Sequence, residues 1–156
     1  MSADGHLVLF RRAPLEARRA GLEAFAQTLR EHVAGGREFR CLITDDRELR
    51  RLNRQFLGKD YPTDVLSFPE PPPPGRRKAS PGGFLGELAV SAHRAREQAA
   101  EFGHGLGEEI RILMLHGVLH LLGMDHETDR GRMARAETAW RKKFGLPRGL
   151  IERVRP

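Results

Sequence analysis

The chain has 156 residues, 39% hydrophobic and 31% charged, a balance typical of one folded domain rather than a disordered or fibrous chain. Its net charge of +6 indicates either an anionic partner, such as RNA, DNA or an acidic protein, or simply a basic, solvated surface. The single cysteine, Cys41, excludes an internal disulfide, and no apolar run approaches the length of a membrane span. We therefore expect one cytoplasmic domain, residues 1–156, with no signal peptide.

The first part of the chain alternates short apolar runs with helical periodicity. Residues 7–10 and 39–43 predict two strands. Between them, apolar residues recur at helical spacing over 15–33 and predict one helix. Asp45 and Glu48 are a capping pair and predict a further helix after the second strand.

The middle of the chain predicts two more strands, residues 65–68 and 84–90, separated by a loop rich in proline over 70–83. Ser91 is the expected cap of a helix that runs to Phe102. This mixture of strands and helices, with the helices concentrated late in the chain, predicts an α+β fold.

Helical patterns cover 107–122 and 127–143, which brings the predicted total to about five helices. The first of them is apolar on nearly every side, which indicates a buried helix. The second carries apolar residues at helical spacing, among them Trp140, which we interpret as a core residue.

The most informative residues are three of the seven histidines, which fall within eleven positions. His116 and His120 are four residues apart, so on a helix they lie on one face. Gly123 supplies a helix end, after which His126 can turn back toward them. Three imidazoles in an apolar pocket are typical of a transition-metal site, most simply one zinc ion. The other interpretation is core histidines, each bonded to a buried polar partner.

Position 117 separates this pattern from that of a peptidase. The histidine spacing equals that of the His-Glu-x-x-His-x-x-Gly-x-x-His proteases, but Gly117 stands where their general base would be. Three protein ligands leave a fourth position for water, as in catalytic sites. A metal-bound water ionises near neutral pH and is the only catalytic group that we predict beyond the ligands.

Three segments together resemble the YbeY-type endoribonucleases, a family of bacterial rRNA maturation factors. They occur in the family's order within about residues 41 to 144. The segments are His116-Gly117-Val118-Leu119-His120-Leu121-Leu122-Gly123-Met124-Asp125-His126, the residues Lys59-Asp60 with Pro62-Thr63-Asp64-Val65-Leu66-Ser67-Phe68-Pro69, and Leu85-Gly86-Glu87-Leu88-Ala89-Val90-Ser91 with Gln98-Ala99 and Gly103-His104.

The resemblance implies a mixed four-stranded sheet with surrounding helices. It implies one zinc ion held by His116, His120 and His126, on the buried helix and the turn after it. It also implies hydrolytic cleavage of single-stranded RNA, maturation of ribosomal RNA including the 3′ end of 16S rRNA, and quality control of the small ribosomal subunit.

Basic residues close to these motifs are candidates for contacts with RNA phosphates: Arg54, Lys59, Arg94 and Arg111. The YbeY-type proteins usually have an arginine, thought important for handling RNA, where this chain has Leu57. That role then requires Arg54 or Lys59 to reach the same place.

Asp125 immediately precedes a predicted ligand and has two interpretations. It orients a metal-bound imidazole, or it caps the last helix. The chain also departs from the family at Met124, usually an aromatic residue or histidine, and at Glu87, usually aspartate.

Two other functions fit the same residues. In a non-catalytic assembly factor the metal would only join helix to turn, while the basic face binds rRNA or a ribosomal protein. A metal-dependent hydrolase of another substrate, such as a peptidase, is disfavoured by Gly117.

Overall fold

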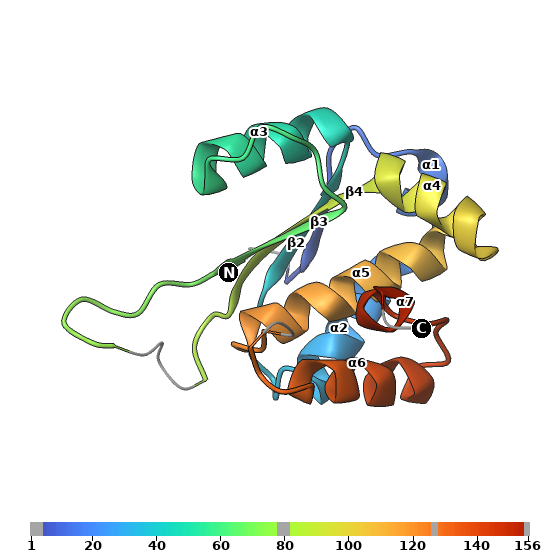
Figure 1. Ribbon diagram of the computed structural model, residues 1–156. Helices are drawn as coiled ribbons and strands as arrows, with labels where there is room; N and C mark the ends of the chain where they lie inside the picture. Colours follow the sequence, from blue (N-terminus) through green and yellow to red (C-terminus); the bar gives the residue numbers. More distant parts are fainter. Residues whose placement is uncertain (1–4, 78–81, 126–127, 155–156) are drawn as a thin grey trace.

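The computed structural model describes residues 5–77, 82–125 and 128–154 (Figure 1). Its sheet consists of β1 (Val8–Phe10), β2 (Arg40–Thr44), β3 (Val65–Pro69) and β4 (Gly86–Ser91). The described residues also form seven helices, α1 (Leu15–Arg18), α2 (Leu22–His32), α3 (Asp46–Leu57), α4 (Ala92–Phe102), α5 (Leu106–Leu121), α6 (Arg132–Lys143) and α7 (Leu150–Val154). None of these helices is both long and apolar enough to cross a membrane.

The sheet is mixed, as predicted, with the strand order β1-β2-β4-β3. Strands β1, β2 and β4 run parallel, and β3 pairs antiparallel with β4, with Ser67 opposite Leu88. All four predicted strands are confirmed, with small shifts at their ends. The α+β prediction is therefore confirmed.

The helices differ from the prediction in number. The single helix expected over 15–33 is two helices, because Gly21 between them takes a left-handed conformation with φ +71°. Helix α6 begins later than predicted, at Arg132, and the Asp129 carboxylate accepts the Met133 N–H at its start. Short helix α7 follows it and was not predicted.

The two predicted helix caps are confirmed. The Asp45 side chain accepts the N–H of Glu48 at 2.9 Å, and the Ser91 hydroxyl accepts the N–H of Arg94 at 3.1 Å. Each bond satisfies a backbone donor that has no partner within its helix. Local signals therefore place the starts of α3 and α4 correctly.

The two faces of the sheet carry different layers (Figure 1). Helix α5 lies along one face with α2 and α6 beyond it, and α3 lies on the opposite face. Leu88 and Val90 of β4 belong to the larger apolar cluster with α5. Ala89 points to the other face and packs with Leu66 of β3 and Leu49 of α3. Because β4 is covered on both faces, its side chains are mostly apolar.

Cys41 belongs to the larger cluster and is 1% exposed. Burial raises the pKa of its thiol to about 12, so it stays protonated at neutral pH. The predicted role of a core thiol is confirmed.

Gly117 lets α5 approach the sheet closely. A Cβ atom at this position would lie 2.6 Å from Leu88 Cδ2, well inside van der Waals contact. On the neighbouring strand, the Ser67 hydroxyl donates to the Gly117 carbonyl at 3.3 Å. The residue between the two histidines therefore serves helix-to-sheet packing.

We expect Gly117→Ala to lower the free energy of unfolding by about 1 kcal/mol. Overpacking against Leu88 costs about 1–3 kcal/mol, which outweighs the gain of about 1 kcal/mol in helix propensity. Urea denaturation measures the change. In a Leu88→Val background the Cδ atoms are absent, so the same substitution should be neutral or stabilising; an equal loss in both backgrounds would contradict the packing explanation.

Candidate metal centre

The structure brings the first two predicted ligands together. His116 and His120 lie in the last turns of α5, with ring centroids 4.8 Å apart and ring planes at 72°. His116 is 7% exposed, and His120 is partly buried. The third predicted ligand, His126, lies outside the described residues.

Glu137 of α6 holds His116 in place. Its Oε2 lies 2.6 Å from His116 Nδ1, and its Oε1 accepts the Ile151 N–H at 3.0 Å. The Glu137 side chain is fully buried. A single carboxylate therefore links α5, α6 and the first turn of α7.

Gly149 makes this linkage possible. A Cβ atom at position 149 would overlap the Glu137 carboxylate, so only glycine lets the backbone come this close. Sequence reasoning missed Glu137, although one signal was present: it occupies an inward position of α6, one turn after the buried Met133. A lone acidic residue on an apolar face indicates a buried polar contact.

Asp125 lies in the turn after α5. Its carbonyl oxygen accepts the N–H groups of Thr128 and Asp129. The N-cap position of α6 is Gly131, not Asp125, and the Asp129 carboxylate accepts the Met133 N–H in its first turn. Of the two roles considered for Asp125, the structure thus assigns the cap to another residue, and the orienting role stays a prediction.

The four predicted RNA contacts have different surroundings. Arg111 donates to the Ala20 carbonyl at 2.5 Å and its guanidinium lies over the Phe25 ring, so it packs against the N-terminal helices. Arg94 lies 3.4 Å from an Asp46 carboxylate oxygen. Arg54 and Lys59 are exposed, at the end of α3 and just after it. The structure favours these last two as contacts with a polyanion.

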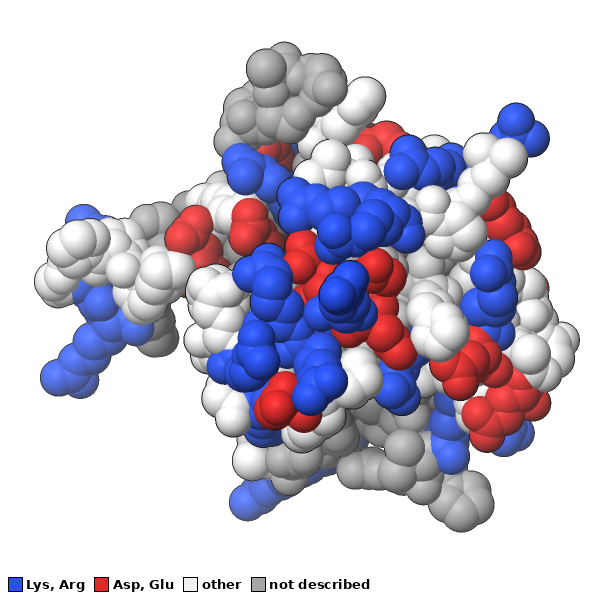
Figure 2. Space-filling model, turned by 90° about the horizontal axis from the view of Figure 1, so that it is seen from above, with Lys and Arg blue, Asp and Glu red and all other residues white. Residues whose placement is uncertain are grey.

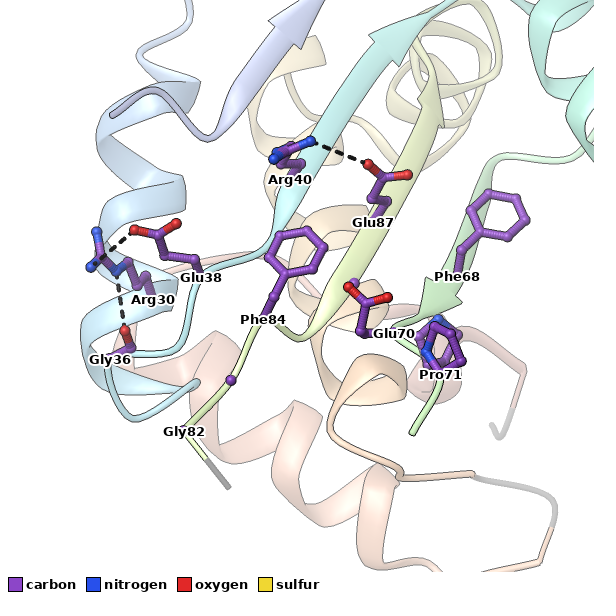
Figure 3. A pocket seen from close by; sticks show the side chains of 13 residues that line it. Arg30, Gly36, Glu38, Arg40, Phe68, Glu70, Pro71, Gly82, Phe84 and Glu87 are labelled. Carbon is purple, nitrogen blue, oxygen red and sulfur yellow. Dashed lines mark hydrogen bonds and ion pairs between the residues drawn. The ribbon is translucent and has the colours of Figure 1, made fainter. Parts of the chain in front are cut away.

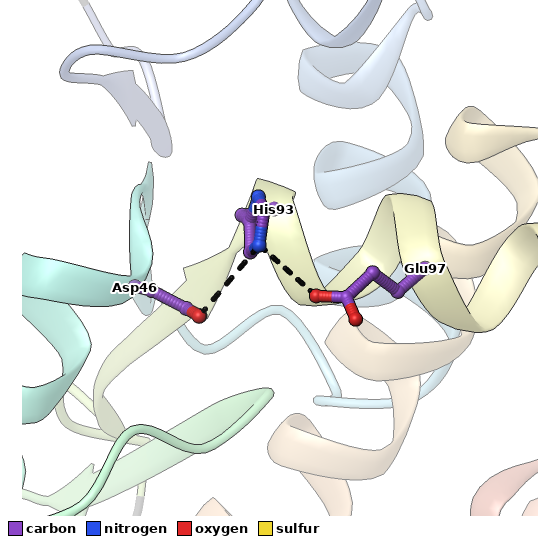
Figure 4. Close-up of side chains that lie close together, drawn as sticks. All are labelled: Asp46, His93 and Glu97. Atoms are coloured by element: carbon purple, nitrogen blue, oxygen red, sulfur yellow. Dashed lines mark ion pairs between the residues drawn. The ribbon is translucent and has the colours of Figure 1, made fainter.

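A second group of potential ligands lies at the start of α4 (Figure 4). Asp46, His93 and Glu97 bring three ligand atoms within 4.8 Å of one another. The His93 and Glu97 side chains are 63% and 65% exposed, and the Asp46 carboxylate also binds the Ser91 hydroxyl and faces Arg94. An arginine beside the same carboxylate competes with a cation, so this group is the weaker metal candidate.

A hollow of about 760 Å³ opens where the 70–85 segment leaves the sheet, and not at the histidines (Figure 3). Its charged side chains form two ion pairs, Arg30 with Glu38 at 3.5 Å and Arg40 with Glu87 at 3.7 Å. Glu70 adds a third carboxylate. With more acidic than basic groups, this hollow does not favour phosphate.

Comparison with known proteins agrees with this architecture. The family model described as endoribonuclease YbeY matches residues 15–145. The chain belongs to the YbeY family. A YbeY endoribonuclease of Solibacter usitatus is 60% identical over 98% of this chain and 97% of its own length. One from Nautilia profundicola is 48% identical over 75% of this chain and 79% of its own.

The YbeY fold is also shared with a solved structure. The solution structure of TM1509 from Thermotoga maritima has a TM-score of 0.56 and 27% identity, and 85% of each chain is covered. The resemblance stated from the sequence motifs is thereby confirmed, and so is the fold that it implied.

Proposed function

We propose that this chain is a metal-dependent endoribonuclease that hydrolyses single-stranded RNA with one zinc ion held by His116, His120 and His126. Its proposed substrate is ribosomal RNA, including the 3′ end of 16S rRNA, and its proposed partner is the small ribosomal subunit. Membership of the YbeY family supports the reaction class. The single observation that carries the site is the imidazole pair at the end of α5, in which His116 is buried and His120 partly buried.

The donor set of this pair fits zinc. The Glu137 carboxylate faces His116 Nδ1, and with Nδ1–H as the donor of that bond Nε2 carries the lone pair that a metal needs. Nitrogen ligands on neighbouring turns of a helix suit a tetrahedral ion. When bound, zinc supplies Lewis acidity and a water that ionises near neutral pH.

The chain's own residues do the remaining work in this proposal. The apolar walls of α5 exclude water around the imidazoles, which strengthens electrostatic interactions there. Glu137 keeps His116 in one tautomer and one orientation. Arg54 and Lys59 draw in the RNA backbone, so binding should weaken steeply with salt.

A peptidase is disfavoured on structural grounds as well. The glutamate that would act as general base would stand at Gly117, where even a Cβ atom overlaps Leu88. The general base of that protease signature therefore has no room in this fold. No feature of the described site residues specifically favours an assembly factor with a structural metal.

The proposal covers residues 1–156 as a single domain in the cytoplasm. One apolar cluster joins residues from Leu7 to Ile151, which supports one folding unit. The excess of 27 basic over 21 acidic residues supports a polyanionic substrate.

The test compares His120→Ala with His93→Ala. Metal content of the purified proteins and cleavage of a defined single-stranded RNA are both measured. We expect His120→Ala to lose bound metal and cleavage while its thermal unfolding changes little, and His93→Ala to keep both. The opposite pattern would move the metal to the Asp46 group. Metal loss with intact cleavage would support a structural ion, and casein hydrolysis by the wild type would support a peptidase.

A further inference from the structure

Arginines crowd one hollow of the surface formed by α3 and the end of β1. Its volume is about 680 Å³. Figure 2 looks down on the α3 side of the molecule and shows Lys and Arg side chains gathered there with a few acidic ones among them. We call this feature the arginine hollow; it is lined by Arg11, Arg12, Arg47, Glu48, Arg50, Arg51 and Arg54.

The helix periodicity explains why the arginines of α3 gather. Arg47, Arg50, Arg51 and Arg54 are spaced by three or four residues, so they share one face of the helix. The opposite face carries the apolar residues, such as Leu49, that pack on the sheet. The basic face spans about 10 Å at 1.5 Å per residue. That length exceeds the spacing of neighbouring phosphates on a nucleic-acid strand, so the face can contact at least two of them.

Buried Glu48 holds two of the six guanidinium groups in place. Its carboxylate accepts from Arg11 Nη1 at 2.8 Å and from Arg51 Nε at 2.7 Å. These bonds, that of Arg51 first, hold the pKa of Glu48 below its ordinary value, so it stays ionised. Because Arg11 and Arg51 are already ordered, these two side chains would lose little conformational entropy when a ligand binds.

The hollow keeps a surplus of positive charge. Arg12 pairs with Asp45 at 3.1 Å and Arg50 with Asp60 at 2.9 Å. With Glu48, three carboxylates thus face six guanidinium groups, which leaves a surplus of three positive charges. Each guanidinium has five N–H donors, and one ion pair uses only one or two of them. The remaining donors suit phosphate oxygens.

An exposed aromatic side chain lies on the loop whose Asp60 pairs with Arg50 of the hollow. Tyr61 is 52% exposed, and its loop is fastened to α3 by the bond from Asn53 Nδ2 to the Tyr61 carbonyl and by the Arg50–Asp60 pair. Exposed aromatic rings beside a basic groove are how proteins hold single-stranded nucleic acid, since every base has a face that stacks.

We propose that the arginine hollow and Tyr61 form a docking site for the backbone and one base of single-stranded RNA, separate from the imidazole pair. Helix α3 lies on the face of the sheet opposite α5 (Figure 1), so RNA held here is anchored away from the histidines. The proposal rests on the proposed function, since it takes RNA as the substrate. An acidic protein segment would lack the planar bases that Tyr61 would stack.

The test measures binding of a short fluorescent oligouridine over a range of salt concentrations, in a His120→Ala background that leaves the RNA intact. The variant is Arg47→Ala with Arg54→Ala, because among the described residues neither arginine forms an ion pair with Glu48 or Asp60. Losing two phosphate contacts should reduce the slope of log K against log salt by about 1.4 and the affinity about 25-fold at 0.1 M salt.

The matched control is Lys142→Ala with Lys143→Ala on α6, which removes the same charge outside the hollow and should leave the slope unchanged. Tyr61→Ala should lower affinity about tenfold with an unchanged slope, because stacking releases no counterions. Equal effects of the two double variants, or competition by polyglutamate as strong as by RNA, would overturn the proposal. The proposed function would then still stand if the wild type cleaves RNA and His120→Ala does not.

Discussion

Glu137→Gln is expected to weaken zinc binding by about 10- to 100-fold, the usual effect of losing the partner of a metal-bound histidine. Both oxygens of Glu137 face donors, His116 Nδ1–H and the Ile151 N–H. A glutamine has only one acceptor oxygen. If that oxygen keeps the Ile151 bond, its NH₂ group donates to His116 Nδ1 and moves the proton to Nε2, where it blocks a metal.

Competition with a chelator measures the zinc affinity, and nitrogen chemical shifts of the metal-free protein report the tautomer of His116. The control is Glu152→Gln, which alters another carboxylate that fastens α7, through Arg141 at 2.8 Å, without touching a histidine. We expect the control to bind zinc normally. Normal zinc binding by Glu137→Gln, with only a lower unfolding temperature, would mean that Glu137 merely joins the helices.

Glu109→Gln is expected to lower the free energy of unfolding by about 3–5 kcal/mol, the cost of leaving a buried charge without its partner. Glu109 is fully buried at the start of α5 and accepts two bonds from Arg153, at 2.9 and 2.6 Å. Its Oε1 also lies 2.6 Å from His104 Nε2. Glutamine keeps the shape and removes the charge, so urea denaturation isolates the ionic contribution.

Glu152→Gln serves as the control here too, because its pair with Arg141 is more exposed and should contribute only about 1 kcal/mol. Arg141 holds the pKa of Glu152 below its ordinary value of 4.5. A lowered folded-state pKa gives stability that is present above 4.5 and is lost as the pH falls through the folded-state value. The control and the wild type should therefore converge in acid. A small effect of Glu109→Gln would show that Arg153 finds water instead.

Local signals in the sequence were enough to predict most of the secondary structure. Short apolar runs and helical patterns predicted four strands and the buried helix α5, and cap-forming residues predicted the caps Asp45 and Ser91. The spacing of His116 and His120 was sufficient to place both rings on one side of α5, because an α-helix repeats every 3.6 residues. The family could be named from the same motifs.

Contacts between residues far apart in the sequence could be identified only from the tertiary structure. Glu137 meets His116 across 21 positions and Ile151 across 14, and no local pattern encodes such distances. The close packing of α5 on β4 requires a glycine at position 117. From the sequence, Gly117 could be interpreted only as the absence of a peptidase's general base. The surroundings of a basic side chain depend in the same way on the elements that pack beside it. Arg111 and Arg54 looked alike in the sequence, but one packs on Phe25 and the other is open to solvent.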